Sequence, residues 1–254
     1  IFGEHPIEMG MVGKEQEMME WMQQDPKYQK MFELAFKQEQ KPVNVKNMTK
    51  ALASFQRSLV SFNSPYDRYR YLGEQNAISA AAKRGEKLFN SEQMECFHCH
   101  GGINFSDSVQ HENLAFTEVA FHNTGLYNID GQGAYPTPNT GINEITQEAE
   151  DMGRFKVPTL RNIALTAPYM HDGSVATLRD AIAHYQAGGR TISEGELAGI
   201  GSQNPYKSGF VKGFEATESE INDLIEFLNS LTDRDFITNP DYSDPNLQPV
   251  ANQS

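Results

Sequence analysis

The chain has 254 residues, of which 38% are hydrophobic, and a formal net charge of −13 from 21 basic and 34 acidic side chains. This length is enough for one large domain or two smaller ones, each with its own core. The negative charge opposes binding to nucleic acid or to an anionic membrane, and no apolar run approaches the ~20 residues of a membrane helix. The composition therefore predicts a soluble protein with no nucleic-acid partner and no membrane span.

Apolar residues recur at helical spacing along much of the chain. The predicted helices cover residues 14–40 with a break at Asp25-Pro26, then 45–62, 77–90, 175–187 and 217–231. Residues 64–75 read as a linker, and residues 101–156 as a long irregular loop region of the kind that functional sites use. No segment shows the alternation of a strand, so the pattern predicts a mainly α fold.

Residues 96–100 read CFHCH and contain both cysteines of the chain. C-x-x-C-H is the attachment signature of a c-type haem, in which Cys96 and Cys99 form thioethers and His100 binds the iron from one side. A thioredoxin-like site would need a βαβ context, and a structural zinc site would need four ligands around one ion. Neither context is visible. The motif predicts covalently bound haem c, which is attached on the extracytoplasmic side, so we expect a periplasmic protein.

The ligand at the second axial position of the iron separates electron carriers from catalysts. Met170 is one candidate, because Met opposite His is the common electron-transfer arrangement. Tyr185 is the other, because a phenolate stabilises ferric and higher oxidation states. Arg154 and Arg161 are candidates for bidentate pairing with haem propionates, although surface ion pairs explain them equally well. The residues alone leave these alternatives open.

Several motifs resemble the bacterial di-haem cytochrome c peroxidase and MauG superfamily. They are PIEMG at 6–10, ALASFQR at 51–57, GRFKVPTLRN at 153–162 and LTAPYMHDG at 165–173. FHNTGLY at 121–127 and the His184-Tyr185 pair are most similar to the MbnH-like branch, whose members modify a tryptophan of a partner protein during copper-protein maturation. The resemblance implies class I cytochrome c-like helical haem domains with long irregular loops.

The same resemblance implies a domain organisation. Residues 1–70 would be the C-terminal part of an N-terminal, peroxidatic haem domain, residues 71–238 a C-terminal haem domain, and residues 239–254 an extended tail. The superfamily has two haems and this chain has one C-x-x-C-H motif. The second haem is therefore expected upstream of Ile1 or on a separate polypeptide.

The resemblance also implies roles for individual residues. Tyr185 matches the axial tyrosine of MauG and MbnH-like enzymes, where the peroxidases have methionine. Glu8 matches the distal carboxylate of the peroxide-reactive haem, which moves a proton between the peroxide oxygens. The backbone carbonyls of Thr166 and Pro168 match an inter-haem calcium site, and oxygen donors suit this hard cation.

The function implied is that of an oxidoreductase that uses hydrogen peroxide. The upstream haem would react with peroxide, and the haem at residues 96–100, with Tyr185, would store an oxidising equivalent for a partner protein. In the MbnH-like branch the substrate would be a tryptophan of that partner. One alternative is a plain cytochrome c peroxidase supplied with electrons by a small redox protein. Another is a non-enzymatic electron-transfer cytochrome, which predicts Met170 as the iron ligand.

Overall fold

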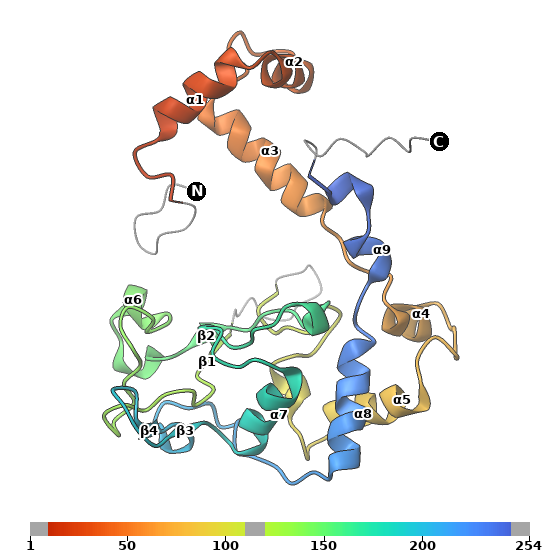
Figure 1. The fold of residues 1–254 in the computed structure, drawn as a ribbon, viewed down its shortest axis with the longest axis vertical. Coiled ribbons are helices and arrows are strands. Elements are labelled where there is room, and N and C mark those ends of the chain that lie inside the picture. Colours follow the sequence, from red (N-terminus) through yellow and green to blue (C-terminus); the bar gives the residue numbers. More distant parts are fainter. Residues whose placement is uncertain (1–9, 110–119, 245–254) are drawn as a thin grey trace, which may run out of the picture. The chain divides into compact units, whose positions relative to one another are not determined.

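The computed structural model describes residues 10–109 and 120–244, and this part of the chain is mainly helical (Figure 1). Two compact units can be separated: unit 1 is Ile1–Val60 and unit 2 is Ser61–Ser254. Among the described residues, no helix combines the length and the apolar character needed to cross a membrane. Glu8 lies outside the described residues.

Unit 1 contains three helices in its described part: α1 (Glu15–Gln24), α2 (Pro26–Ala35) and α3 (Val45–Ser58). Asp25 separates the first two, because its side chain accepts the first free N–H of α2 and Pro26 suits the first helical position. Its small core consists of Met22, Phe32, Val43 and Met48. The helix predicted over 45–62 ends at Ser58, and Leu52 and Phe55 on its apolar stripe are exposed.

Unit 2 combines helices with long loops and two small antiparallel sheets, β1 with β2 and β3 with β4. Its α-helices are α4 (Pro65–Tyr71), α5 (Ala80–Phe89), α6 (Asn143–Thr146), α7 (Leu178–Gln186), α8 (Glu218–Asn229) and α9 (Arg234–Ile237). Its strands are β1 (Phe121–His122), β2 (Phe155–Lys156), β3 (Thr191–Ile192) and β4 (Gly199–Ile200). The prediction of a mainly α fold is confirmed, and the two-residue strands gave no signal in the sequence because they are too short to show an alternating pattern.

The linker predicted at residues 64–75 is also wrong, because α4 occupies much of it. Ser64 and Asp67 form a capping box, and Pro65 takes the first helical position. Tyr66 and Asp67 are buried, and the Tyr66 N–H donates to the Ser230 carbonyl at the end of α8. The polar residues of this segment therefore have partners inside unit 2. The division between the units follows Val60, earlier than the domain boundary predicted after residue 70.

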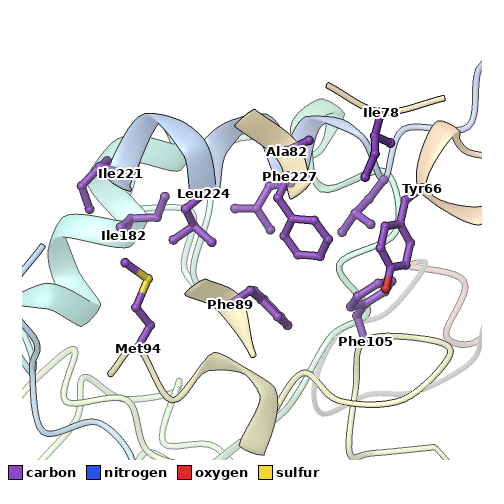
Figure 2. Packing of buried hydrophobic residues seen from close by; sticks show 12 residues of the cluster. Tyr66, Ile78, Ala82, Phe89, Met94, Phe105, Ile182, Ile221, Leu224 and Phe227 are labelled. Carbon is purple, nitrogen blue, oxygen red and sulfur yellow. The ribbon is translucent and has the colours of Figure 1, made fainter. Parts of the chain in front are cut away.

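The apolar core of unit 2 forms where α5 crosses α8 (Figure 1). Gly85 permits this contact, because a Cβ there would lie 2.0 Å from the carbonyl oxygen of Asp223. The Asp223 carboxylate in turn binds Arg84 through two hydrogen bonds of 2.6 Å each. Figure 2 shows the rings of Phe89 and Phe227, whose centroids are 5.1 Å apart, beside the rest of the core. Phe89 also lines the cavity described below, so this core forms part of the wall of the functional site.

Candidate haem-binding site

Unit 2 contains a cavity of about 760 Å³, a size typical of cofactor sites. Its wall brings together most of the site residues predicted from the sequence: Cys96, Cys99, His100, Arg161, Thr166, Pro168, Met170 and Tyr185. Arg154 does not line it; its side chain is 37% exposed and pairs with Asp151 at 3.1 Å. Residues from distant parts of the chain therefore face one space.

The CFHCH motif forms a short 3-10 helix over Cys96–His98, and the His100 N–H donates to the Cys96 carbonyl at 3.0 Å. Both cysteines are free thiols and half-buried. Burial raises the pKa of each thiol to about 12, so both remain protonated in the haem-free chain. Both thiols line the cavity beside His100, as thioether attachment of a haem requires.

The His100 ring is oriented by the loop that follows it. Its Nδ1 lies 3.0 Å from the carbonyl oxygen of Phe105, a residue in the left-handed conformation with φ 50°. Burial lowers the pKa of His100, so the ring is neutral, and Nδ1 takes the role of donor to that carbonyl. The lone pair of Nε2 is then available to a metal, which is the usual arrangement for a metal-binding histidine.

Tyr185 lies near the end of α7, a helix that begins where the Thr177 side chain accepts the Asp180 N–H. Within the described residues, the Tyr185 hydroxyl has no hydrogen-bond partner, and burial raises the pKa of this phenol. The competing ligand Met170 also lines the cavity, but its side chain packs against the cluster of Leu126, Tyr127 and Tyr135. The geometry therefore favours Tyr185 as the group that is free to bind.

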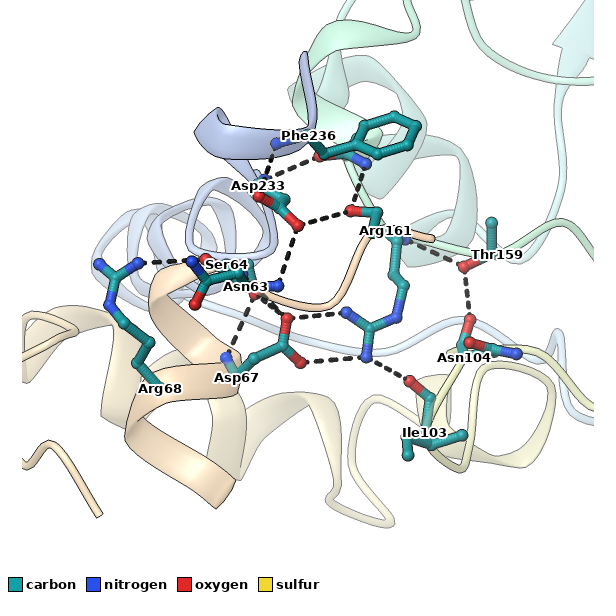
Figure 3. Close-up of polar contacts among 12 residues, drawn as sticks. Asn63, Ser64, Asp67, Arg68, Ile103, Asn104, Thr159, Arg161, Asp233 and Phe236 are labelled. Carbon is teal, nitrogen blue, oxygen red and sulfur yellow. Dashed lines mark hydrogen bonds and ion pairs between the residues drawn. The ribbon is translucent and has the colours of Figure 1, made fainter. Parts of the chain in front are cut away.

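Arg161 is held by α4 (Figure 3). Its Nη1 and Nη2 bind the two oxygens of Asp67 at 2.9 and 3.0 Å, and Nη2 also donates to the Ile103 carbonyl at 2.7 Å. The predicted bidentate pairing with a haem propionate does not fit this geometry, because Asp67 occupies that face of the guanidinium. The Nε of Arg161 is buried without a partner. Asp67 was overlooked in the sequence because its segment resembled a linker.

Thr166 and Pro168 line the cavity wall after the short helix Ile163–Leu165. Among the described residues, neither carbonyl oxygen accepts a hydrogen bond. Such free carbonyl oxygens are suitable donors for a hard cation such as calcium.

His122 in the cavity wall pairs with a carboxylate that was not predicted from the sequence. His122, on β1, places Nε2 2.7 Å from Oδ2 of Asp107, and the Asp107 N–H donates to the Cys99 carbonyl at 2.8 Å. His122 lines the cavity beside the motif. No residue spacing connects these two positions, so only the folded chain could reveal the pair.

The residues of the cavity fit a covalently attached haem. Two protonated thiols lie beside a neutral imidazole that is oriented through Nδ1, and on the same wall lies a phenol that has no hydrogen-bond partner among residues 10–109 and 120–244. Much of the remaining wall is apolar, as a porphyrin requires: Phe89, Val157, Leu160, Ile163, Leu178, Ile182, Phe214, Leu224 and Leu228.

Comparison with known proteins agrees with this geometry. A family model described as di-haem cytochrome c peroxidase matches residues 3–76. A crystal structure of a MauG-like protein associated with microbial copper homeostasis is 44% identical in sequence, with a TM-score of 0.90 over 96% of this chain and 69% of that chain. The chain belongs to the di-haem cytochrome c peroxidase and MauG family.

Two relatives in this family are methylamine utilization proteins MauG. The one from Methylorubrum extorquens is 35% identical over 208 residues, which are 81% of this chain and 49% of the relative. The one from Methylophilus methylotrophus is 36% identical over 207 residues, or 80% of this chain and 51% of the relative. The chain thus spans about half the length of these two members of the MauG family.

Proposed function

We propose that this chain forms the C-terminal haem-binding part of a periplasmic di-haem oxidoreductase that uses hydrogen peroxide. The observation that supports this most strongly is the cavity itself, where His100 and Tyr185, whose hydroxyl has no hydrogen-bond partner in the described part of the chain, share a wall with both thiols. When bound, haem c supplies one-electron redox chemistry at its iron. Family membership supports peroxide as the oxidant.

The residues of this chain would bind and tune the group. Cys96 and Cys99 would anchor it, and the Phe105 carbonyl would keep His100 in the tautomer that binds iron. Tyr185, once deprotonated on the iron, would supply a negative charge that favours storage of an oxidising equivalent. The carbonyl oxygens of Thr166 and Pro168 would hold a calcium ion.

Other parts of the proposal concern the whole protein. A second haem outside this chain would react with peroxide, and Glu8 would move a proton between the two peroxide oxygens. A tryptophan of a partner protein would then be oxidised, which the likeness to a MauG-like protein associated with copper homeostasis supports. A plain peroxidase would instead take electrons from a small redox protein. A periplasmic location would follow from the attachment of haem c, which takes place on the extracytoplasmic side.

Ferric optical and EPR spectra of the haem-loaded protein test the iron ligand. We expect Tyr185→Phe to change both spectra, whereas Met170→Ala leaves them as in the wild type. The opposite pattern would be a thioether-to-iron band in the far red that survives Tyr185→Phe and disappears in Met170→Ala. Together with no response to peroxide, that pattern would identify an electron-transfer cytochrome.

Peroxide added to the full-length protein with both haems tests the activity. We expect the haem absorption spectrum to change after peroxide is mixed with the protein. Glu8→Gln should slow that change by about 10²- to 10⁴-fold, the usual contribution of a positioned proton-transfer group. Unchanged haem spectra in the wild type, or a Glu8→Gln variant as fast as the wild type, would contradict the peroxidase proposal.

A further inference from the structure

A tyrosine bound to a carboxylate lies close behind the wall of the haem cavity. Tyr127 is buried, and its hydroxyl donates a hydrogen bond of 2.6 Å to Oδ2 of Asp172. This distance lies within the range over which a proton passes directly between two groups. Tyr127 is therefore paired with a base that can take its phenolic proton.

The base is held in its ionised form by its neighbours. Oδ1 of Asp172 accepts the Ser174 N–H at 3.0 Å, and the Arg190 guanidinium lies 4.0 Å from Oδ2. Burial opposes ionisation, yet the hydrogen bonds from Tyr127 and Ser174 hold the pKa of Asp172 below its ordinary value. Arg190 also lies over the Tyr127 ring, 4.6 Å from its centroid.

Aromatic rings connect this pair with the cavity. His171 and Phe155 both line the cavity, and their rings are stacked with centroids 3.7 Å apart. The His171 ring lies 6.5 Å from Tyr127 and 6.0 Å from Tyr135, and these two tyrosines are 5.4 Å apart. An electron can thus pass from Tyr127 to the cavity through rings in contact, without crossing solvent.

We propose that Tyr127 is a redox-active residue that relays oxidising equivalents from the haem site toward the protein surface. In the step itself, Tyr127 gives one electron to the oxidised haem and its phenolic proton to Asp172. The O–H bond breaks, the haem is reduced by one electron, Asp172 becomes a carboxylic acid, and a neutral phenoxyl radical remains on Tyr127. An electron from an outside donor restores Tyr127, which takes its proton back from Asp172.

The position of the pair suits this role. The side chains of Asp172 and Arg190 are 15% and 22% exposed, so these two charged groups are partly open to solvent while the Tyr127 ring is buried. An electron donor at this surface could be oxidised without reaching the haem. The inference rests on the proposed function, because peroxide must first oxidise the haem.

Tyr66 provides a matched control. It is buried in the same unit and also donates to a carboxylate, that of Glu86 at 3.0 Å. Its ring contacts Phe105 and Phe227 on the side of the apolar core, and Tyr66 is not part of the cavity wall. Tyr66→Phe therefore removes the same group in a comparable bond without touching the proposed relay.

The experiment is rapid-freeze EPR of the full-length di-haem protein after mixing with hydrogen peroxide, with haem absorption followed in parallel. We expect an organic radical that narrows when the protein contains ring-deuterated tyrosine. The signal should be lost in Tyr127→Phe, retained in Tyr66→Phe and strongly reduced in Asp172→Asn, whose amide can accept the hydrogen bond but not the proton. The bands of the oxidised haem should decay more slowly in Tyr127→Phe.

Two failures can be told apart. Haem bands that do not respond to peroxide would overturn the proposed function and this inference with it. Haem bands that respond while the radical signal is absent, or persists unchanged in Tyr127→Phe, would overturn the relay alone. Resting ferric spectra and thermal unfolding of each variant show whether the fold and the haem site are intact, so that a lost signal reports on Tyr127.

Discussion

Unit 2 contains two regions that are held together by different forces. Around α5 and α8, apolar side chains fill the interior, and Phe227 and Leu231 are fully buried. Between residues 121 and 216 the chain is mostly loop, and its buried residues include the amides Asn123, Asn128 and Asn204. The haem cavity has walls from both regions. A cofactor site can therefore combine a core built on burial with loops built on hydrogen bonds.

In the loop region the side-chain amides of buried asparagines bind backbone N–H and carbonyl groups, which in a β-sheet would bind those of a neighbouring strand. Asn204 donates to the carbonyls of Tyr127 and Gly133 at 2.8 and 3.2 Å, and it accepts the Tyr206 N–H at 2.8 Å. Asn128 likewise binds the Ile200 carbonyl and the Gly133 N–H. Each amide thus satisfies backbone groups that would otherwise be buried without partners.

The largest effect is expected in the apolar region. Phe227→Ala leaves a cavity among Phe89, Phe105 and Tyr66, and should lower the free energy of unfolding by about 3–5 kcal/mol. Chemical denaturation of the haem-loaded chain measures this change. A loss below ~1 kcal/mol would mean that the region does not depend on its apolar packing. Ile237→Ala, at an exposed position, serves as the control.

The buried ion pair of Asp67 and Arg161 joins α4 to the loops of the cavity wall, and its loss should have the second-largest effect. Both side chains are buried, at 3% and 6% exposure. Asp67→Ala leaves the buried guanidinium without its carboxylate and also removes the capping-box bonds to Ser64, so it should lower the free energy of unfolding by about 3–5 kcal/mol. Asp67→Leu combined with Arg161→Met should recover the part of this loss that comes from the unpaired guanidinium, but not the part that comes from the capping box. A double variant no more stable than Asp67→Ala would argue against this account.

The contrast between the regions also explains what the sequence could predict. The helix predicted over 217–231 corresponds to α8 because its apolar stripe repeats at helical spacing and Thr217 with Glu220 forms a capping box. α4 was not predicted, because its burial depends on partners such as Arg161 that are distant in sequence. Amides such as Asn204 have no periodic signal. Their partners become visible only in the folded chain.

The functional site shows the same contrast between local sequence signals and contacts between distant residues. Cys96, Cys99 and His100 are readable from their local spacing, because attachment chemistry dictates it. Nothing in the spacing predicts that the Phe105 carbonyl orients His100 or that Tyr127 binds Asp172. These contacts join positions that only loop geometry brings together.

A smaller effect is expected in the loop region. Asn204→Ala removes both donor bonds and leaves the Tyr127 and Gly133 carbonyls buried, so it should lower the free energy of unfolding by about 1–3 kcal/mol. Hydrogen exchange should show increased opening of residues near 127–133 with little change in α5 and α8. Asn204→Asp keeps the acceptor but faces two carbonyl oxygens with a carboxylate oxygen, so it should cost more than Asn204→Ala. Equal loss of protection in α5 and α8 would mean that the two regions unfold as one.

The smallest effect on stability is expected at the N-terminus of α8, where Thr217 and Glu220 form the capping box. The Thr217 hydroxyl accepts the Glu220 N–H at 3.3 Å, and the Thr217 N–H donates to the Glu220 carboxylate at 2.8 Å. Thr217→Ala should cost about 1 kcal/mol and Thr217→Ser much less, as measured by chemical denaturation at neutral pH.

The same box predicts a dependence on pH. Hydrogen bonds from the Thr217 N–H and hydroxyl lower the pKa of Glu220 from its ordinary value of 4.5. A carboxylate with a lowered pKa in the folded state stabilises the protein above its unfolded value and loses this contribution as the pH falls through the folded value. The stability difference between wild type and Glu220→Gln should therefore be largest at neutral pH and shrink as the pH falls below 4.5. The exposed Glu215→Gln is the charge-matched control, and an equal pH trend in both variants would trace the effect to net charge instead of to the cap.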